Sequence, residues 1–315
     1  MWKKIPTVTG YIPVEEIGVT SMHEHISLPD GFDRQAIEFQ IKDLLYAKKL
    51  GLKTIVELTP SSKMRDVCKT MDAMKEISVR SGIQIIPCTG HYVAFSEEEK
   101  NFNADQFYQL WLEEVEYGIG DSGIRPGIIK VASGNTVPDI YETRILQAAG
   151  KLQKNTGLPI CVHSVSGCRN QQDILERTGA DLGHVYFSHV EAEFGWEGRT
   201  VDQQLNYLES VAEKGSCFSY NNFGNGAHTK PENLLKIVQG MISRGYSDRQ
   251  FATMDLVLTG AEGEIRVLWD DINSGGRERT YSYLLKNALP WMIKNGVSKE
   301  NVRKMVCENV ARFFA

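Results

Sequence analysis

Short apolar runs rich in β-branched residues alternate along this chain with longer amphipathic runs, and this alternation constrains the fold more than any other feature. The pattern is typical of repeated βα units that build a parallel sheet. Eight units can be counted, with strands expected near 17–22, 53–58, 83–88, 126–131, 158–162, 184–188, 216–220 and 251–254. Helices are expected after each strand, the first four at Ala36–Leu50, Arg65–Arg80, Asp105–Tyr117 and Tyr141–Asn155.

Eight such units favour a closed (β/α)8 barrel, a TIM barrel, over an open doubly wound sheet. The open sheet normally has fewer units and a glycine-rich phosphate turn after its first strand. The whole chain, residues 1–315, is expected to form this single domain, because no linker or low-complexity tract interrupts it. Four glycines stand where helices should end: Gly51, Gly82, Gly157 and Gly215. The segment Gly260–Arg279, rich in glycine and charged residues, is expected to be an extended loop after the last strand.

Charge and cysteine content narrow the class of protein. The net charge is −5 and no run of Lys or Arg is long enough for a nucleic-acid or membrane-surface patch, so neither partner is expected. The six cysteines contain no Cys-x-x-Cys pair, which indicates reduced thiols rather than a disulfide framework. No signal-type or membrane-spanning apolar stretch is present. We expect a soluble, cytoplasmic protein.

Histidines gather at the ends of the expected strands. In a (β/α)8 barrel the chemistry lies at the carboxyl ends of the strands, where the βα-loops surround one mouth. His23 and His25 are two residues apart at the end of the first strand, so both can point inward. His163 ends the fifth strand and His189 ends the sixth. Each histidine alone is a weak signal, but their shared placement indicates a metal site.

A lysine and an aspartate complete this set. Lys130 lies in the apolar fourth strand, and Asp255 follows the eighth. Burial disfavours the charged form of a lysine, and a neutral amine can capture carbon dioxide to give a carbamate that bridges two metals. Two alternatives stay open: Lys130 could pair with a buried acid, and Asp255 could cap the following segment.

These residues stand in motifs that resemble those of the phosphotriesterase family of the amidohydrolase superfamily, in the same order. The motifs are Thr20-Ser21-Met22-His23-Glu24-His25, Gly127-Ile128-Ile129-Lys130, Val162-His163, Ser188-His189 and Thr253-Met254-Asp255. The similarity runs from Gly10-Tyr11-Ile12-Pro13 to the closing Glu308-Asn309-Val310-Ala311-Arg312-Phe313-Phe314. The resemblance implies a (β/α)8 barrel and activity on phosphotriesters, lactones or other carboxylic esters.

The resemblance also implies a binuclear divalent site, commonly zinc, although manganese, cobalt, nickel or iron would suit such ligands. By this comparison His23, His25 and Asp255 hold one metal, His163 and His189 hold the other, and a carboxylated Lys130 bridges them. A metal-bridging hydroxide would attack the substrate, with Asp255 taking its proton. Tyr92 matches a position where lactonases of the family carry a tyrosine over the bound ring. A homodimer is expected at the family level.

The substrate is expected to be a small ester, most of all a lactone. Basic residues fall in several mouth loops, and arginine suits a carboxylate or phosphate, so we expect an anionic lactone, such as a sugar-acid or phosphorylated one, bound by Lys230, Arg277 and Arg279. The alternatives are a phosphotriester or phosphodiester hydrolase with the same site, and a barrel that keeps its metal but serves only as a binding or regulatory protein.

The other acidic residues and histidines near the expected strand ends are interpreted as structural or solvated residues rather than as ligands. Glu24 points away from the two histidines and is expected to make a structural hydrogen bond or ion pair. Glu191 and Glu193 are expected to be solvated loop residues rather than a proton relay behind His189. His184 is expected at the opposite end of the barrel, His91 in packing behind the site, and His228 in a solvated loop. The loop after the seventh strand, residues 220–226, lacks the acidic residue common in that region of the family.

Overall fold

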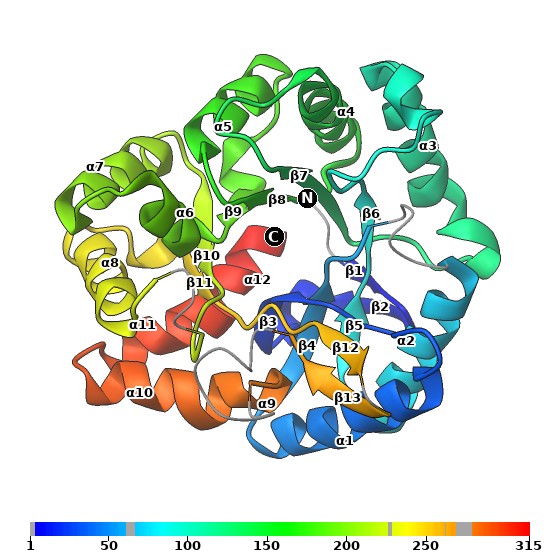
Figure 1. Cartoon of the computed structure of the whole chain (residues 1–315), viewed down its shortest axis with the longest axis horizontal. Coiled ribbons are helices and arrows are strands. Elements are labelled where there is room, and N and C mark those ends of the chain that lie inside the picture. Colours follow the sequence, from blue (N-terminus) through cyan, green and yellow to red (C-terminus); the bar gives the residue numbers. More distant parts are fainter. Residues whose placement is uncertain (1–3, 61–66, 226–228, 262, 269–278) are drawn as a thin grey trace.

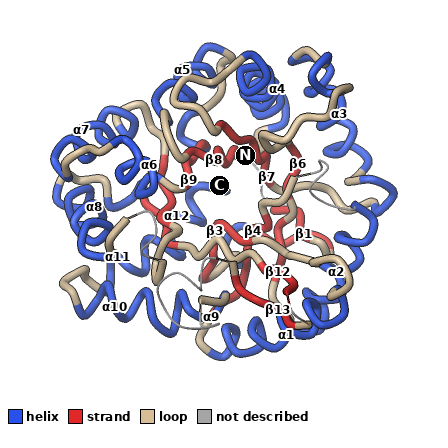
Figure 2. Tube along the Cα trace, in the orientation of Figure 1, coloured by secondary structure: helices blue, strands red, loops and turns tan. Residues whose placement is uncertain are grey.

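Two parallel sheets enclose the centre of the molecule, and helices surround them in an outer ring (Figures 1 and 2). The computed structural model describes residues 4–60, 67–225, 229–261, 263–268 and 279–315. The strands are β3 (Val19–Glu24), β4 (Leu52–Glu57), β5 (Gln84–Ile86), β6 (Cys88–Gly90), β7 (Ile128–Ser133), β8 (Ile160–Ser164), β9 (Val185–Ser188), β10 (Cys217–Tyr220) and β11 (Gln250–Ala252). Each expected strand is present, with bounds displaced by one or two residues.

The two sheets form one barrel. Their strand orders are β3-β4-β5 and β6-β7-β8-β9-β10-β11, all parallel, and β5 and β6 are one expected strand interrupted at Pro87. The outer strands meet near β3, where the backbone amide of Asp255 donates to the carbonyl of His23 at 2.9 Å. The predicted (β/α)8 barrel is therefore confirmed.

A helix or helical run follows every strand on the outside of the barrel. The helices are α1 (Asp33–Lys49), α2 (Val67–Ser81), α3 (Ala104–Tyr117), α4 (Ile140–Thr156), α5 (Cys168–Arg177), α6 (Val190–Glu197), α7 (Val201–Ala212) and α8 (Pro231–Ser243). After β11 come α9 (Tyr281–Tyr283), the π-helical turn Leu284–Ala288, α10 (Leu289–Lys294), α11 (Lys299–Arg303), the turn Lys304–Glu308 and α12 (Asn309–Phe314). No helix in the described ranges is long and apolar enough to cross a membrane.

The ends of these helices follow from local sequence. Capping boxes begin α3 at Asn103 and α4 at Asp139, because each side chain accepts from the backbone while the third residue reaches back. Gly157 ends α4 with φ 76°, as its predicted place after the helix required. Gly90 of β6 has a different role: a Cβ there would lie 1.9 Å from the carbonyl oxygen of Lys130, so only glycine lets β6 approach β7 this closely.

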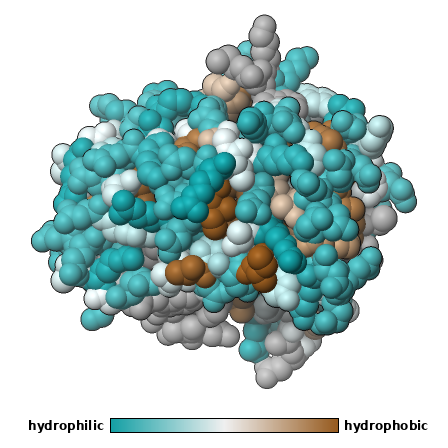
Figure 3. All heavy atoms as spheres, turned by 90° about the horizontal axis from the view of Figure 1, so that it is seen from above, coloured by the Kyte–Doolittle hydropathy of each residue, from teal (hydrophilic) through white to brown (hydrophobic). Residues whose placement is uncertain are grey.

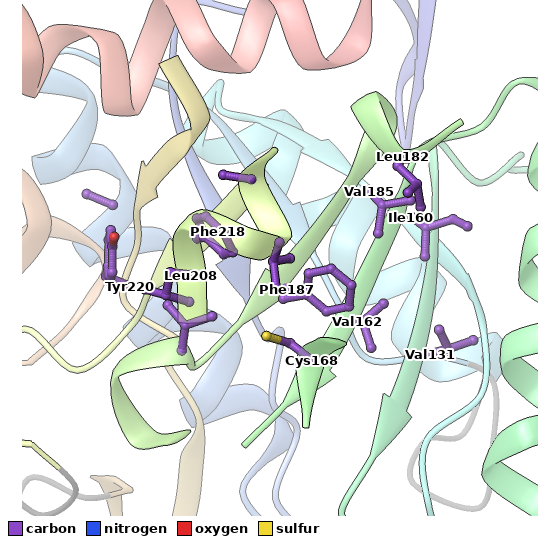
Figure 4. Close-up of a cluster of buried hydrophobic side chains, with 14 of the residues drawn as sticks. Val131, Ile160, Val162, Cys168, Leu182, Val185, Phe187, Leu208, Phe218 and Tyr220 are labelled. Carbon is purple, nitrogen blue, oxygen red and sulfur yellow. The ribbon is translucent and has the colours of Figure 1, made fainter. Parts of the chain in front are cut away.

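The main core fills the layer between the strands and the helices (Figure 4). Phe187 of β9 and Phe218 of β10 pack there beside Leu208 of α7 and Cys168 of α5. A second cluster closes the bottom of the barrel, where Phe313 and Phe314 of α12 pack with Tyr186 and other core residues. This packing fixes the strands whose other ends carry the polar residues.

Two hairpins were not expected. The first joins β1 (Lys4–Thr7) to β2 (Gly10–Pro13) ahead of the barrel. The second joins β12 (Leu258–Ala261) to β13 (Glu264–Val267). The expectation of one extended loop over Gly260–Arg279 was therefore wrong over its first part, because the alternating Leu258, Ile265 and Val267 are buried and pin the strands to the barrel. Residues 269–278 lie outside the described residues.

Candidate active site

Four histidines meet at the carboxyl ends of three strands. His23 is the fifth residue of β3 and His25 follows that strand, while His163 lies in β8 and His189 follows β9. The ring centroids are 5.3 Å apart for His23 and His25, 5.0 Å for His23 and His189, and 4.5 Å for His163 and His189. Residues far apart in sequence thus form one imidazole cluster.

Asp255 lies against this cluster. Its Oδ1 is 3.0 Å from His25 Nε2 and 3.5 Å from His23 Nε2, and its Oδ2 is 3.9 Å from His189 Nε2. Asp255 and His189 have φ values of 56° and 64°, a left-handed conformation that non-glycine residues seldom adopt. Such backbone conformations concentrate at functional sites, where surrounding contacts maintain them.

Lys130 reaches the same cluster from inside the barrel. It is the third residue of β7 and is almost fully buried, so it lies deeper in its strand than the predicted strand end. Its Nζ is 3.3 Å from His23 Nε2 and 3.4 Å from the thiol of Cys161. No acid is recorded within ion-pair distance of this amine among the described residues, so the alternative of a buried ion pair receives no support.

Tyr92 borders the cluster from the loop after β6. Its hydroxyl is 3.2 Å from His163 Nε2, and the two rings pack edge to face with centroids 5.1 Å apart. Burial, and then the charge of Asp255, raise the pKa of Tyr92 to about 12. The phenol therefore stays protonated near neutral pH and can donate a hydrogen bond.

Burial sets the charge state of the imidazoles and the carboxylate. Burial lowers the pKa of His23 and of His163 well below the usual value, assisted by Lys130 and His189 respectively. Burial alone would raise the pKa of Asp255, but His23, His189 and His25 together hold it well below its usual range. Burial thus favours the neutral form of the His23 and His163 rings, which is the form that binds a metal.

Glu24 braces the two strands that carry these ligands. It is fully buried, and its carboxylate accepts from Ser21 Oγ and, at 3.0 Å, from the backbone amide of Leu256. Burial raises its pKa to about 7. The predicted structural hydrogen bond is therefore confirmed, and it fixes the segment that carries Asp255.

The donor set fits a divalent metal. One ligand atom each from His23, His189 and Asp255 lie within 4.8 Å of one another, and His25 Nε2 lies beside the same carboxylate. Nitrogen and carboxylate ligands of this kind suit zinc and the neighbouring transition metals. Thr59 Oγ1 lies 2.7 Å from His25 Nδ1, the outer contact that commonly orients a ligand histidine.

A cavity of about 750 Å³ opens over the cluster. All six ligand-type residues line it, together with Tyr92. Apolar residues make much of its wall, namely Ile26, Leu28, Leu58, Val165, Val257, Leu258 and Leu268. The two asparagines Asn222 and Asn225 add polar groups on the β10 side.

Comparison with known proteins identifies the family of this chain. The sequence model of the Phosphotriesterase family matches residues 3–314. The chain belongs to the phosphotriesterase family. A "Phosphotriesterase homology protein" of Mycobacterium tuberculosis is 25% identical, covering 99% of this chain and 97% of its own length. An "N-acetyltaurine hydrolase" of Xenopus tropicalis is 26% identical over 97% and 96%, and an "Aryldialkylphosphatase" of Saccharolobus solfataricus is 23% identical over 99% and 100%.

The three cations predicted to bind an anionic substrate in this phosphotriesterase-family protein differ in their position relative to the cavity. Lys230 is exposed at the start of α8 and is not among the residues lining the cavity. Arg279 does line the cavity, but it is buried and donates to the backbone carbonyls of Phe223, Asn221 and Met254. Arg277 lies outside the described residues.

One prediction about the acids behind His189 was wrong. Glu191 is not solvated but fully buried, and its Oε1 accepts from the backbone amides of Asn221 and Asn222 at 2.6 and 2.8 Å. Sequence reasoning missed it because α6 begins directly after His189, which turns Glu191 inward. The Glu193 side chain and His228 lie outside the described residues.

Two histidines occupy the places expected of them in this family member. His91 is buried, stacks on Phe95 with a centroid distance of 4.6 Å, and pairs with Glu99 at 3.1 Å. His184 lies at the opposite end of the barrel, where its Nδ1 is 2.7 Å from the carbonyl of Phe313. Neither is part of the imidazole cluster.

Proposed function

We propose that this phosphotriesterase-family hydrolase acts on carboxylic esters, most of all lactones, with two divalent metal ions, zinc in the first place. The observation that carries the proposal is the convergence of four histidines, Lys130 and Asp255 on the floor of one cavity that also holds a protonated tyrosine. In this proposal His23, His25 and Asp255 would hold one ion, His163 and His189 would hold the other, and a carbamate on Lys130 would serve as a ligand to both.

The bound ions would supply an activated water and polarise the scissile carbonyl oxygen. Asp255, held ionised by its histidine neighbours, accepts the proton of the attacking water and returns it to the leaving oxygen. In a lactone that oxygen belongs to the ring and stays in the product. Tyr92 lines the cavity beside His163, from which its hydroxyl would donate to the ring ester.

Two other substrate classes are favoured by the relatives' names. The aryldialkylphosphatase points to phosphotriesters and the N-acetyltaurine hydrolase to amides, both of which the same acid–base groups could serve. Of the three cations predicted to bind an anionic lactone, Arg277 alone is kept in this proposal, because Lys230 does not line the cavity and Arg279 donates to backbone carbonyls. A cytoplasmic location is proposed because the five cysteines whose side chains are described form no disulfide.

A substrate screen tests this proposal. Metal-loaded protein is offered simple and phosphorylated lactones, an aryl phosphotriester and an N-acetyl amide, and acid release is followed with a pH indicator. We expect the highest kcat/KM with a lactone, and we expect Arg277→Ala to weaken only the phosphorylated one. Faster turnover of the phosphotriester or the amide than of every lactone would reverse the substrate ranking.

A further inference from the structure

Asn222 presents an amide to the cavity without a complete set of hydrogen bonds. Its side chain lines the cavity and is only 7% exposed, and its buried Nδ2 has no hydrogen-bond partner among the described residues. Buried polar groups in folded proteins are nearly always paired, because an unpaired one costs about 1–3 kcal/mol. A carboxamide at the cavity wall for which the described residues supply no such partner is therefore available to hydrogen-bond a ligand.

The backbone that carries this amide is held from both sides. Glu191 Oε1 accepts from the amide nitrogens of Asn221 and Asn222, at 2.6 and 2.8 Å. On the other side the Arg279 guanidinium donates to the carbonyls of Asn221 and Phe223. The segment is thus fixed by two buried ionisable side chains, Glu191 and Arg279.

The turn that follows is equally constrained. The amide of Asn225 donates to the carbonyl of Asn222 at 3.0 Å, and Gly224 has φ 76°. A Cβ at Gly224 would lie 2.6 Å from the hydroxyl of Tyr283, so the turn packs closely against α9. A rigid backbone places the Asn222 side chain in one position, as a specificity contact requires.

We propose that Asn222 is a specificity-determining residue that hydrogen-bonds an uncharged polar group, a hydroxyl or an amide, next to the scissile bond of the substrate. This inference rests on the proposed function, since it takes the cavity as the substrate site. A carboxamide is neutral and both donates and accepts, so it matches a hydroxyl or amide rather than an anion. The apolar part of the cavity wall, which includes Leu258 and Val257, would bind the remaining carbon skeleton.

Two lactones that differ by one hydroxyl test the proposal. Metal-loaded wild-type protein, Asn222→Ala, Asn222→Leu and the control Asn206→Ala, an exposed residue of α7, are each assayed with γ-butyrolactone and α-hydroxy-γ-butyrolactone. We expect wild-type and control proteins to prefer the hydroxylated lactone by about threefold to tenfold in kcat/KM, mainly through KM. Both Asn222 variants should bring that ratio close to one while hydrolysis of γ-butyrolactone changes by less than about twofold.

The outcomes separate the two proposals. A ratio unchanged in Asn222→Ala, an equal fall for both lactones, or a ratio restored by the similarly sized Asn222→Leu would overturn the role of Asn222. If wild-type protein hydrolyses neither lactone, the proposed function fails instead. The intact lactones are then titrated by calorimetry, and the same ratio, taken from dissociation constants, supports or overturns the Asn222 contact.

Discussion

His189 and Asp255 show how single residues in this protein are held in unfavourable conformations. Left-handed backbone at a non-glycine residue costs on the order of 1–3 kcal/mol. At His189 the backbone amide donates to Asn221 Oδ1 at 3.2 Å, and at Asp255 it donates to the carbonyl of His23 at 2.9 Å. These contacts direct both side chains into the cluster. The sequence marks the two residues as candidates, but it contains no sign of their left-handed backbone.

Glu24 gives a prediction at this scale. Glu24→Ala leaves the buried amide of Leu256 without its acceptor, so we expect a loss of about 1–3 kcal/mol in the free energy of unfolding and a fall in kcat as Asp255 loses its support. Glu24→Gln keeps an amide oxygen as acceptor and should lose less than half as much stability. Denaturant unfolding and steady-state kinetics provide the two measurements.

Glu16→Ala, which removes an exposed carboxylate ahead of β3, is the matched control and should behave as wild type. Equal stability of Glu24→Ala and Glu16→Ala would contradict a bracing role for Glu24.

At the scale of the elements, spacing along each strand predicts which histidines can share a site, because residues two apart point the same way and parallel strands end at one edge. Spacing cannot predict partners that come from distant loops. Glu191 and Arg279 are charged residues in polar stretches, and such residues are usually solvated. Glu191 is buried because α6 begins immediately after His189. Arg279 is buried because backbone carbonyls that follow β10 and β11 accept from its guanidinium.

A surface ion-pair network between α1 and α2 gives a prediction about pH. The guanidinium of Arg80 lowers the pKa of Glu38, and Arg34 foremost lowers the pKa of Glu76. A carboxyl whose folded-state pKa is depressed contributes stability above its unfolded pKa and loses it as the pH falls through the folded pKa. Arg80→Ala should therefore melt below wild type at pH 7, by no more than about 2 °C because the groups are exposed, and the difference should be smaller at about pH 3.

Thermal melts at both pH values, in low and high salt, measure this effect. Glu113→Gln, an exposed carboxyl of α3, serves as the comparison and should show no such pH-dependent difference. An Arg80→Ala difference that persisted or grew in acid would show that the ion pairs are not its cause.

At the scale of the whole molecule, the alternation of apolar and amphipathic runs is enough to predict the barrel, since all eight strands occur where their β-branched residues stand. The hairpins β1–β2 and β12–β13 escape this reasoning because each is short and begins or turns among glycines and charged residues. Their place depends on packing against the barrel. Figure 3 shows a face on which hydrophilic side chains predominate and apolar ones are scattered. The hydropathy of that face therefore gives no indication of where the buried site lies.

The central claim is a binuclear metal site bridged by Lys130, and metal analysis combined with one variant tests it most directly. Purified protein is assayed for bound divalent ions by elemental analysis, and Lys130→Ala is compared with wild type in metal content and lactone hydrolysis. We predict about two ions per chain in wild type, on the pattern of two-metal hydrolase sites, and loss of both the second ion and the activity in Lys130→Ala. Fewer than about one ion per chain in wild type, or full activity in Lys130→Ala, would contradict the account.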